Sequence, residues 1–186
     1  WGMRDTAESY VGRGGNIAFL SGNSVCWQVR FEDEGRTMVC HKDDVVGDPL
    51  YGTDQQHLVS TLWCSQIVGR PENQLTGVSF SRGGYIRMGN AVPAATGGYT
   101  AWRPDHWVFR GSNVHYGDQF GAKDRITVYE VDGCEFTLSL EDGLPVPTGR
   151  DGTPTNFTIL ATAPARLWSF AELPSRYRAS ERGDLE

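Results

Sequence analysis

The sequence predicts an α/β fold: a parallel sheet core to which β-hairpins and long loops are added. The first observation is a helical pattern over residues 3–11, which passes through a glycine-rich turn into an apolar segment over residues 16–20. Helix, tight turn and buried strand in that order form an αβ unit of a parallel sheet. The second is alternation of apolar and polar residues over 27–41, typical of a hairpin with one solvated face. The third is the length of 186 residues, enough for one domain with its own core.

The helix and the strand after it are predicted from spacing. Apolar residues recur at i, i+4, i+7 and i+8 and share one helical face, namely Met3, Ala7, Tyr10 and Val11. Gly12 and the pair Gly14-Gly15 end the helix. The run over 16–20 is short, apolar and bounded by glycine, as expected for a strand buried on both faces.

The next segment predicts a hairpin followed by an acidic loop. Residues 27–32 alternate, Asp33-Glu34-Gly35 form the turn, and residues 36–41 return. Residues 42–57 are rich in aspartate, and we interpret the acidic part, 43–54, as a solvated loop. Residues 58–64 are compatible with a short helix.

The second half of the chain is expected to be rich in loops. Glycine, proline, asparagine and aromatic residues dominate 71–124, and a loop-rich stretch of that length is usually functional or a partner surface. A second hairpin is expected over 126–140, with its turn at Asp132-Gly133. Residues 157–163 form one more apolar strand before Pro164.

Composition excludes several classes of protein. The net charge is −6 and the 17 basic residues are scattered, so there is no electrostatic basis for nucleic-acid binding. No apolar run approaches the length of a membrane span. The four cysteines, Cys26, Cys40, Cys64 and Cys134, form no CxxC pair and favour free structural thiols in the cytoplasm.

The first candidate site is the loop Ser21-Gly22-Asn23-Ser24, just past the expected strand. In open α/β sheets ligands bind at that end of the strands, and outward-pointing backbone amides can stabilise an oxyanion. The alternative is an ordinary turn, in which Gly and Asn are common for conformational reasons. Cys26 lies close by as a less favoured nucleophile, because it is not in a nucleophile-elbow motif.

The second candidate site combines histidines, carboxylates and aromatic residues between 105 and 118. His106 is suited to proton transfer near neutral pH. The alternative is a structural histidine beside aromatic packing. A metal site built from His106, His115 and Asp118 lacks any standard ligand spacing.

The third candidate is Glu130, which would share one strand face with Ile126 and Val128. A carboxylate on an apolar face is costly unless it is paired or has a raised pKa and a chemical role. Alternatively, Glu130 marks the end of the strand, where the following turn reaches water.

Nine short motifs follow one another along nearly the whole chain. They are residues 14–23, 27–32, 37–40, 70–73, 75–77, 106–109, 116–118, 129–133 and 163–168. Together they resemble the C-terminal half of the N,N-dimethylformamidase large subunit and its relatives. The resemblance implies a class I glutamine-amidotransferase-like (flavodoxin-like) fold without the cysteine nucleophile, in agreement with the expected αβ unit.

The resemblance also implies amide hydrolysis at a mononuclear iron held by two tyrosines and one glutamate. The iron would act as a Lewis acid and activate water. The glutamate belongs to a His-x-Glu-Tyr-Trp segment, and Trp1 matches its last residue. We therefore expect the iron ligands upstream of Trp1 and no metal ligand within this chain.

Roles for individual residues follow from the same resemblance. Asn23 matches a pocket asparagine, Glu130 matches a pocket glutamate, and His106 lies in a family motif without an assigned role. We predict Glu130 and His106 as catalytic residues, and as substrate-binding residues Ser21, Gly22, Asn23, Trp107 and Asp118.

The sequence thus predicts that residues 1–186 are a single domain, part of the C-terminal domain of a larger cytoplasmic protein. That protein would hydrolyse C–N bonds of small amides, and this chain alone would be inactive. Its partners would be a small amide and the rest of the polypeptide or another subunit, in an oligomer. Two alternatives stay open: a carbohydrate-type binding module using aromatic loops 99–120, and an amidotransferase that depends on Cys26.

Overall fold

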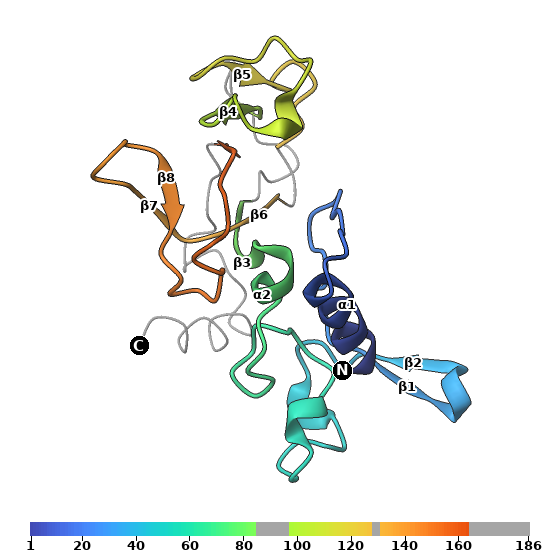
Figure 1. The fold of residues 1–186 in the computed structure, drawn as a ribbon. Helices are drawn as coiled ribbons and strands as arrows, with labels where there is room; N and C mark the ends of the chain where they lie inside the picture. The colour runs from blue at the N-terminus through green and yellow to red at the C-terminus, as the bar shows by residue number, and fades with distance from the viewer. Residues whose placement is uncertain (85–96, 128–130, 164–186) are drawn as a thin grey trace.

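The computed structural model describes residues 1–84, 97–127 and 131–163 (Figure 1). In this part of the chain, short strands and long connections predominate. The helices are α1 (Gly2–Gly12) and α2 (Asn73–Thr76). The strands are β1 (Arg30–Glu32), β2 (Thr37–Val39), β3 (Ser79–Gly84), β4 (Tyr99–Ala101), β5 (Gln119–Phe120), β6 (Val131–Gly133), β7 (Phe136–Leu138), β8 (Pro145–Pro147) and β9 (Ala161–Thr162).

The strands form small antiparallel sheets, and the predicted parallel, flavodoxin-like core is wrong. The pairings among the described residues are β1-β2, β3-β6, β5-β4-β9 and β7-β8, each antiparallel. The segment 16–20, expected as a buried strand, has no regular secondary structure, and its Leu20 side chain is 93% exposed. A short apolar run shows neither which strand it pairs with nor whether it is buried. The αβ unit was therefore predicted without evidence for a neighbouring parallel strand.

Helix α1 confirms the helix predicted over 3–11. It ends before Gly14, whose φ of 88° lies in the left-handed region. Its anchor is Arg4, which is buried although it is charged. The Arg4 guanidinium donates to the Arg70 carbonyl, to the Pro71 carbonyl at 2.8 Å and to the Glu8 carboxylate at 2.8 Å, so its buried donors are satisfied.

The first predicted hairpin is confirmed, since Glu32 pairs with Thr37 across a turn at residues 33–35. The second is wrong in its pairing. Gly133 lies within β6 and pairs with Ser79 of β3, whereas β7 pairs with β8 across the turn Asp142-Gly143. Asp-Gly occurs at both places, and only tertiary pairing decides which one becomes the hairpin turn.

Two other predicted elements differ from the structure. The strand expected over 157–163 is reduced to β9, which pairs with β4. The helix expected over 58–64 is instead a buried segment linked to Trp27 through an isolated bridge at Leu62.

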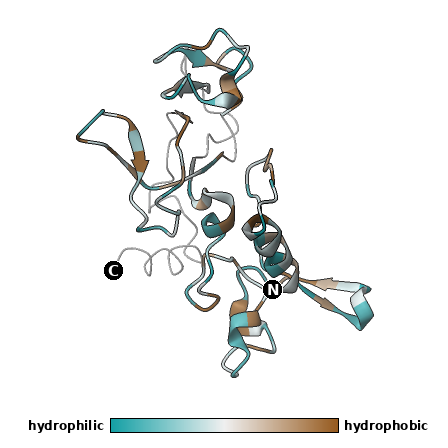
Figure 2. Ribbon diagram, viewed as in Figure 1, coloured by the Kyte–Doolittle hydropathy of each residue, from teal (hydrophilic) through white to brown (hydrophobic). Residues whose placement is uncertain are grey.

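The core around this segment consists of two small clusters. One holds Cys26, Leu62 and Cys64, and the other Val59, Trp63 and Val68. Figure 2 shows further apolar segments distributed over the hairpins, beside hydrophilic ones. Within the described ranges, no helix has the length and apolarity that a membrane crossing requires.

The acidic loop is not simply solvated, because its Asp48 is buried. The carboxylate accepts from the Arg30 guanidinium at 2.8 and 3.0 Å, from the Ser60 backbone at 2.8 Å and from the Ser60 hydroxyl at 2.9 Å. This ion pair ties the loop to β1.

Candidate functional site

The loop over residues 21–25 carries backbone strain. Asn23 has a φ of 55° and Val25 a φ of 58°. Asparagine tolerates this left-handed conformation, but it is a genuine outlier for a β-branched residue such as valine. Such conformations cost about 1–3 kcal/mol each and persist only where the surroundings hold them.

Hydrogen bonds from two directions hold this loop. Within it, the Ser24 hydroxyl donates to the Ser21 carbonyl at 2.9 Å. Across the fold, the Asn23 backbone N–H donates to Asp132 Oδ1 at 3.0 Å, and Asp132 belongs to β6. The contact joins residues that are 109 positions apart in the sequence.

The side-chain amide of Asn23 has unused hydrogen-bonding capacity. Its Oδ1 atom is buried and has no hydrogen-bond partner among the described residues. Leaving a buried polar atom unpaired costs free energy, so such atoms in native proteins call for an explanation. A ligand with a hydrogen-bond donor would satisfy this oxygen.

A second unsatisfied group lies beneath β3. The Glu72 side chain is fully buried, and its Oε1 accepts from the Ser79 hydroxyl at 2.7 Å and from the Phe80 N–H at 3.0 Å. Its Oε2 has no partner among the described residues. Burial raises the pKa of Glu72, and the negative charge of Asp132 raises it further.

Glu72 was not predicted as a site residue from the sequence, although it lies within the family motif at 70–73. Its neighbour Asn73 is also fully buried and donates to the Thr153 hydroxyl at 3.2 Å. A two-residue polar pair inside a 70–77 segment gives no local signal of burial. The motif at 70–73 was the one available pointer.

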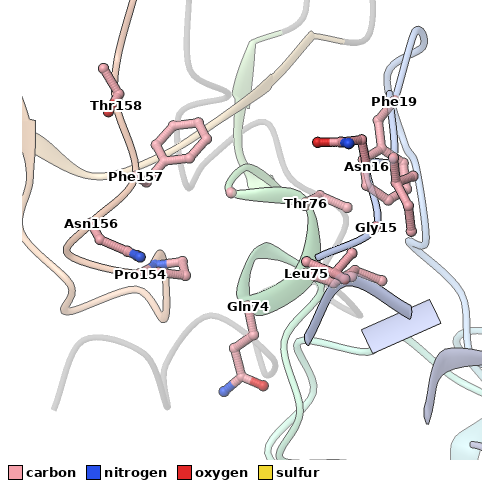
Figure 3. A pocket seen from close by; sticks show the side chains of 13 residues that line it. Gly15, Asn16, Phe19, Gln74, Leu75, Thr76, Pro154, Asn156, Phe157 and Thr158 are labelled. Carbon is pink, nitrogen blue, oxygen red and sulfur yellow. The ribbon is translucent and has the colours of Figure 1, made fainter. Parts of the chain in front are cut away.

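A groove of about 400 Å³ runs along α2 (Figure 3). Segment 15–19 forms one wall and segment 154–158 the other, with α2 between them. Side-chain amides and apolar groups share the lining, which comprises Val11, Gly15, Asn16, Ile17, Phe19, Gln74, Leu75, Thr76, Gly77, Pro154, Asn156, Phe157 and Thr158.

None of these thirteen described residues carries an ionisable side chain. Charged residues make up 22% of the chain, so thirteen residues drawn at random would include about three. Gly77 is required here, because a Cβ on it would collide with the Phe157 ring. The groove is therefore lined without charged side chains, and its wall at 15–19 continues along the chain into the strained loop.

Two of the other predicted site residues lie beside Asn23, and the remaining described ones lie in another part of the fold. Ser21 and Gly22 are exposed at the strained loop. His106 and Trp107 belong to the unit of β4, β5 and β9, and the structure describes no hydrogen bond from either to loop 21–25. Glu130 lies outside the described residues.

The two histidines of that unit form hydrogen bonds with residues close to them in the sequence. His106 Nδ1 accepts from the Val108 N–H at 3.4 Å and thereby caps a short 3-10 helix, Trp107–Phe109. Asp118 accepts from the His115 N–H at 2.8 Å, and this bond together with the His115 ring lowers the pKa of Asp118. In the described part of the chain, no three His, Cys, Asp or Glu residues are grouped as a metal site would need.

The cysteines are placed as structural residues. All four lie in described segments, and none forms a disulfide there. Cys26 is buried in a core cluster, which does not suit a nucleophile. Burial, with the charge of Asp151, raises the pKa of Cys134 to about 11.

The described structure is a β-rich domain with two separate features: a groove lined without ionisable side chains, and a strained loop that carries Asn23 and is not part of the groove lining. A concave, mostly neutral lining is typical of sites for small ligands. Comparison with family models then identifies the family. The chain belongs to the N,N-dimethylformamidase beta subunit-like, C-terminal family, whose model matches residues 1–182. Neither the comparison with curated proteins nor that with solved structures gives a match.

Proposed function

We propose that this chain is the C-terminal part of an iron-dependent amidohydrolase-like protein that hydrolyses the C–N bonds of small amides. The family match supports a part of a dimethylformamidase-like protein. The observation that carries the proposal is Asn23, whose buried amide oxygen is unpaired on a strained backbone. Strain and unsatisfied polarity together are typical of a functional site.

In this proposal Asn23 binds the substrate. Its side-chain NH2 group can donate to the carbonyl oxygen of an amide, and its Oδ1 can accept from the N–H of an N-monoalkyl amide. N,N-dimethylformamide has no N–H, so it would use the NH2 donor alone. Donors that are fixed before the reaction stabilise negative charge as it develops on that oxygen. Ser21 and Gly22, next to Asn23, would line the same site, and Glu130 would assist proton transfer.

The neutral groove supports an uncharged substrate class. Asn16, Gln74 and Asn156 offer side-chain amides, and Leu75 and Phe157 offer apolar contact. A small N-alkyl amide has these two kinds of surface. A charged ligand would be desolvated here without an opposite charge among the groove residues.

The residues described here do not themselves fit an iron ion, because they contain no suitable group of three ligands. Iron remains part of the proposal through the family, with its ligands contributed from outside the described residues.

The partner would be the rest of the same polypeptide or another subunit, in an oligomer. The family name denotes part of a subunit-like protein. Phe136 and Leu138 are exposed at alternate positions of β7 and so share one apolar face of that strand, and Leu140 is exposed in the turn that follows. We place the protein in the cytoplasm because its four cysteines form no disulfide in the described segments.

A second candidate function is carbohydrate-type binding at the β4-β5 unit. Trp107 is 70% exposed and Tyr116 60% exposed, and the Tyr116 ring lies 5.8 Å from the Trp102 ring, centroid to centroid. Under this alternative Trp107→Ala would abolish binding of a soluble oligosaccharide, measured by calorimetry. Under the amide proposal no such binding is expected.

The test of the amide proposal is steady-state hydrolysis of N,N-dimethylformamide by the full-length protein. We expect Asn23→Ala to lower kcat/KM about 100-fold, as loss of one oxyanion donor does. The matched control is Asn113→Ala, on an exposed loop, and it should leave kcat/KM unchanged. Equal activity of the Asn23→Ala variant and the unmodified protein would overturn the role of Asn23.

A further inference from the structure

We propose that Asp132 is the positioning residue of loop 21–25, holding the Asn23 amide in place through the Asn23 backbone. The observation is the bond from the Asn23 N–H to Asp132 Oδ1 at 3.0 Å. The consequence for substrate binding rests on the proposed function of Asn23, but the consequence for loop structure does not.

A closely packed strand pair places Asp132 next to the loop. β6 pairs with β3, and Ser79 lies opposite Gly133, the residue after Asp132. A Cβ on Gly133 would collide with the Arg82 carbonyl, and one on Gly83 would collide with the Val131 carbonyl. The two backbones therefore approach as closely as glycine allows, which fixes the place of Asp132.

A carboxylate suits this task better than a neutral acceptor. Hydrogen bonds to a charged acceptor are about twice as strong as neutral ones. Asn23 and Val25 both occupy the left-handed region, and a single bond from a distant strand offsets part of that strain. The pairing of β3 with β6 thus positions Asp132, and the hydrogen bond from Asn23 to Asp132 holds the loop in its conformation.

Other ionisable groups lie close to Asp132. Glu72 is joined to the same strand pair through the Ser79 hydroxyl at 2.7 Å. Burial raises the pKa of Glu72, and the negative charge of Asp132 raises it further. Tyr99 also faces Asp132, and burial followed by the charge of Asp132 raises the Tyr99 pKa. Arg4 lies near Glu72 but bonds to Glu8 and two carbonyls.

The test compares hydrogen exchange and kinetics in the full-length protein. Asp132→Ala removes the acceptor, whereas Asp132→Asn keeps an oxygen at the same position without the charge. We expect exchange of the 21–25 amides to accelerate at least tenfold in the Ala variant and less in the Asn variant. The control is Asp142→Asn, because Asp142 accepts from the Leu144 N–H at 3.1 Å in a distant hairpin turn.

The kinetic arm separates positioning from general stability. In the Asp132→Asn variant, KM for N,N-dimethylformamide should rise about tenfold. Its melting temperature should equal that of the Asp142→Asn control. Unchanged exchange over 21–25 in both Asp132 variants would overturn the proposal. Accelerated exchange in a protein that hydrolyses no amide would uphold the role of Asp132 in the loop and reject the amide function.

Discussion

Two buried carboxyl groups show how single residues shape this molecule. Asp48 pairs with Arg30, whereas the donors to Glu72 among the described residues are a hydroxyl and a backbone N–H. Burial by itself raises the pKa of both groups, but the Arg30 and Ser60 hydrogen bonds bring the pKa of Asp48 well below its usual value. Asp48 is therefore a charged structural residue, whereas burial shifts the pKa of Glu72 upward.

Asp48→Asn should destabilise the protein by about 3 kcal/mol, because Arg30 loses its buried partner. The depressed pKa means that the contribution of Asp48 is present above the unfolded value near 3.8 and is lost as pH falls through the folded pKa. Urea unfolding at several pH values measures this effect. Asp54→Asn, at an exposed position of the same loop, is the control. Equal stability of the two variants at pH 7 would contradict the assignment.

Glu72→Gln should be tolerated at neutral pH. The raised pKa means that the contribution of Glu72 is fully present below the unfolded value near 4.5 and declines as pH rises through the folded pKa. Glutamine mimics the neutral acid, so this decline should disappear from the stability profile. Glu72→Leu should cost about 1–3 kcal/mol, because the Ser79 and Phe80 donors lose their acceptor. A Gln variant as unstable as the Leu variant would contradict this account.

At the scale of elements, the sequence predicted local structure better than pairing. α1 and the β1-β2 hairpin depend on near neighbours and were predicted. The turn at Asp132-Gly133 and the strand over 16–20 were wrong, because their outcome depends on β3 and on distant surroundings. Antiparallel pairing across more than forty residues leaves no local pattern.

The candidate site divides in the same way. Asn23 was predicted from its loop and from the family motif. Glu72 and Asp132 were not, because their burial and proximity arise only when β3 and β6 pair. His106, Trp107 and Asp118 were predicted as site residues, but the structure places them in the β4-β5-β9 unit, where their hydrogen bonds are local.

The turn between β7 and β8 gives a prediction about backbone conformation. Gly143 has a φ of 71°, and a Cβ added there meets no atom within 4 Å. Gly143→Ala should therefore weaken the hairpin by about 1 kcal/mol through φ alone. Gly12→Ala is the matched control, since Gly12 is equally open but has no positive φ. Hydrogen exchange of the β7 amides and of the Val146 amide in β8 should rise in the first variant and not in the second.

At the scale of the whole molecule, the described part of the chain buries few apolar residues. Eight hydrophobic residues form its core, while larger ones such as Leu20, Met38 and Leu140 are exposed. Proteins on their own rarely leave extended apolar faces in water. We therefore propose that this domain packs on the rest of a larger protein, which would cover these exposed apolar residues and complete the site.

In the proposed function this domain contributes Asn23 to amide hydrolysis by that larger protein. The rate of N,N-dimethylformamide hydrolysis by the full-length protein, compared with its Asn23→Ala variant and with residues 1–186 alone, tests this. We expect turnover by the full-length protein, a loss of about 100-fold in the variant and no turnover by residues 1–186. Turnover by residues 1–186 alone, or undiminished turnover in the Asn23→Ala variant, would contradict the proposed function.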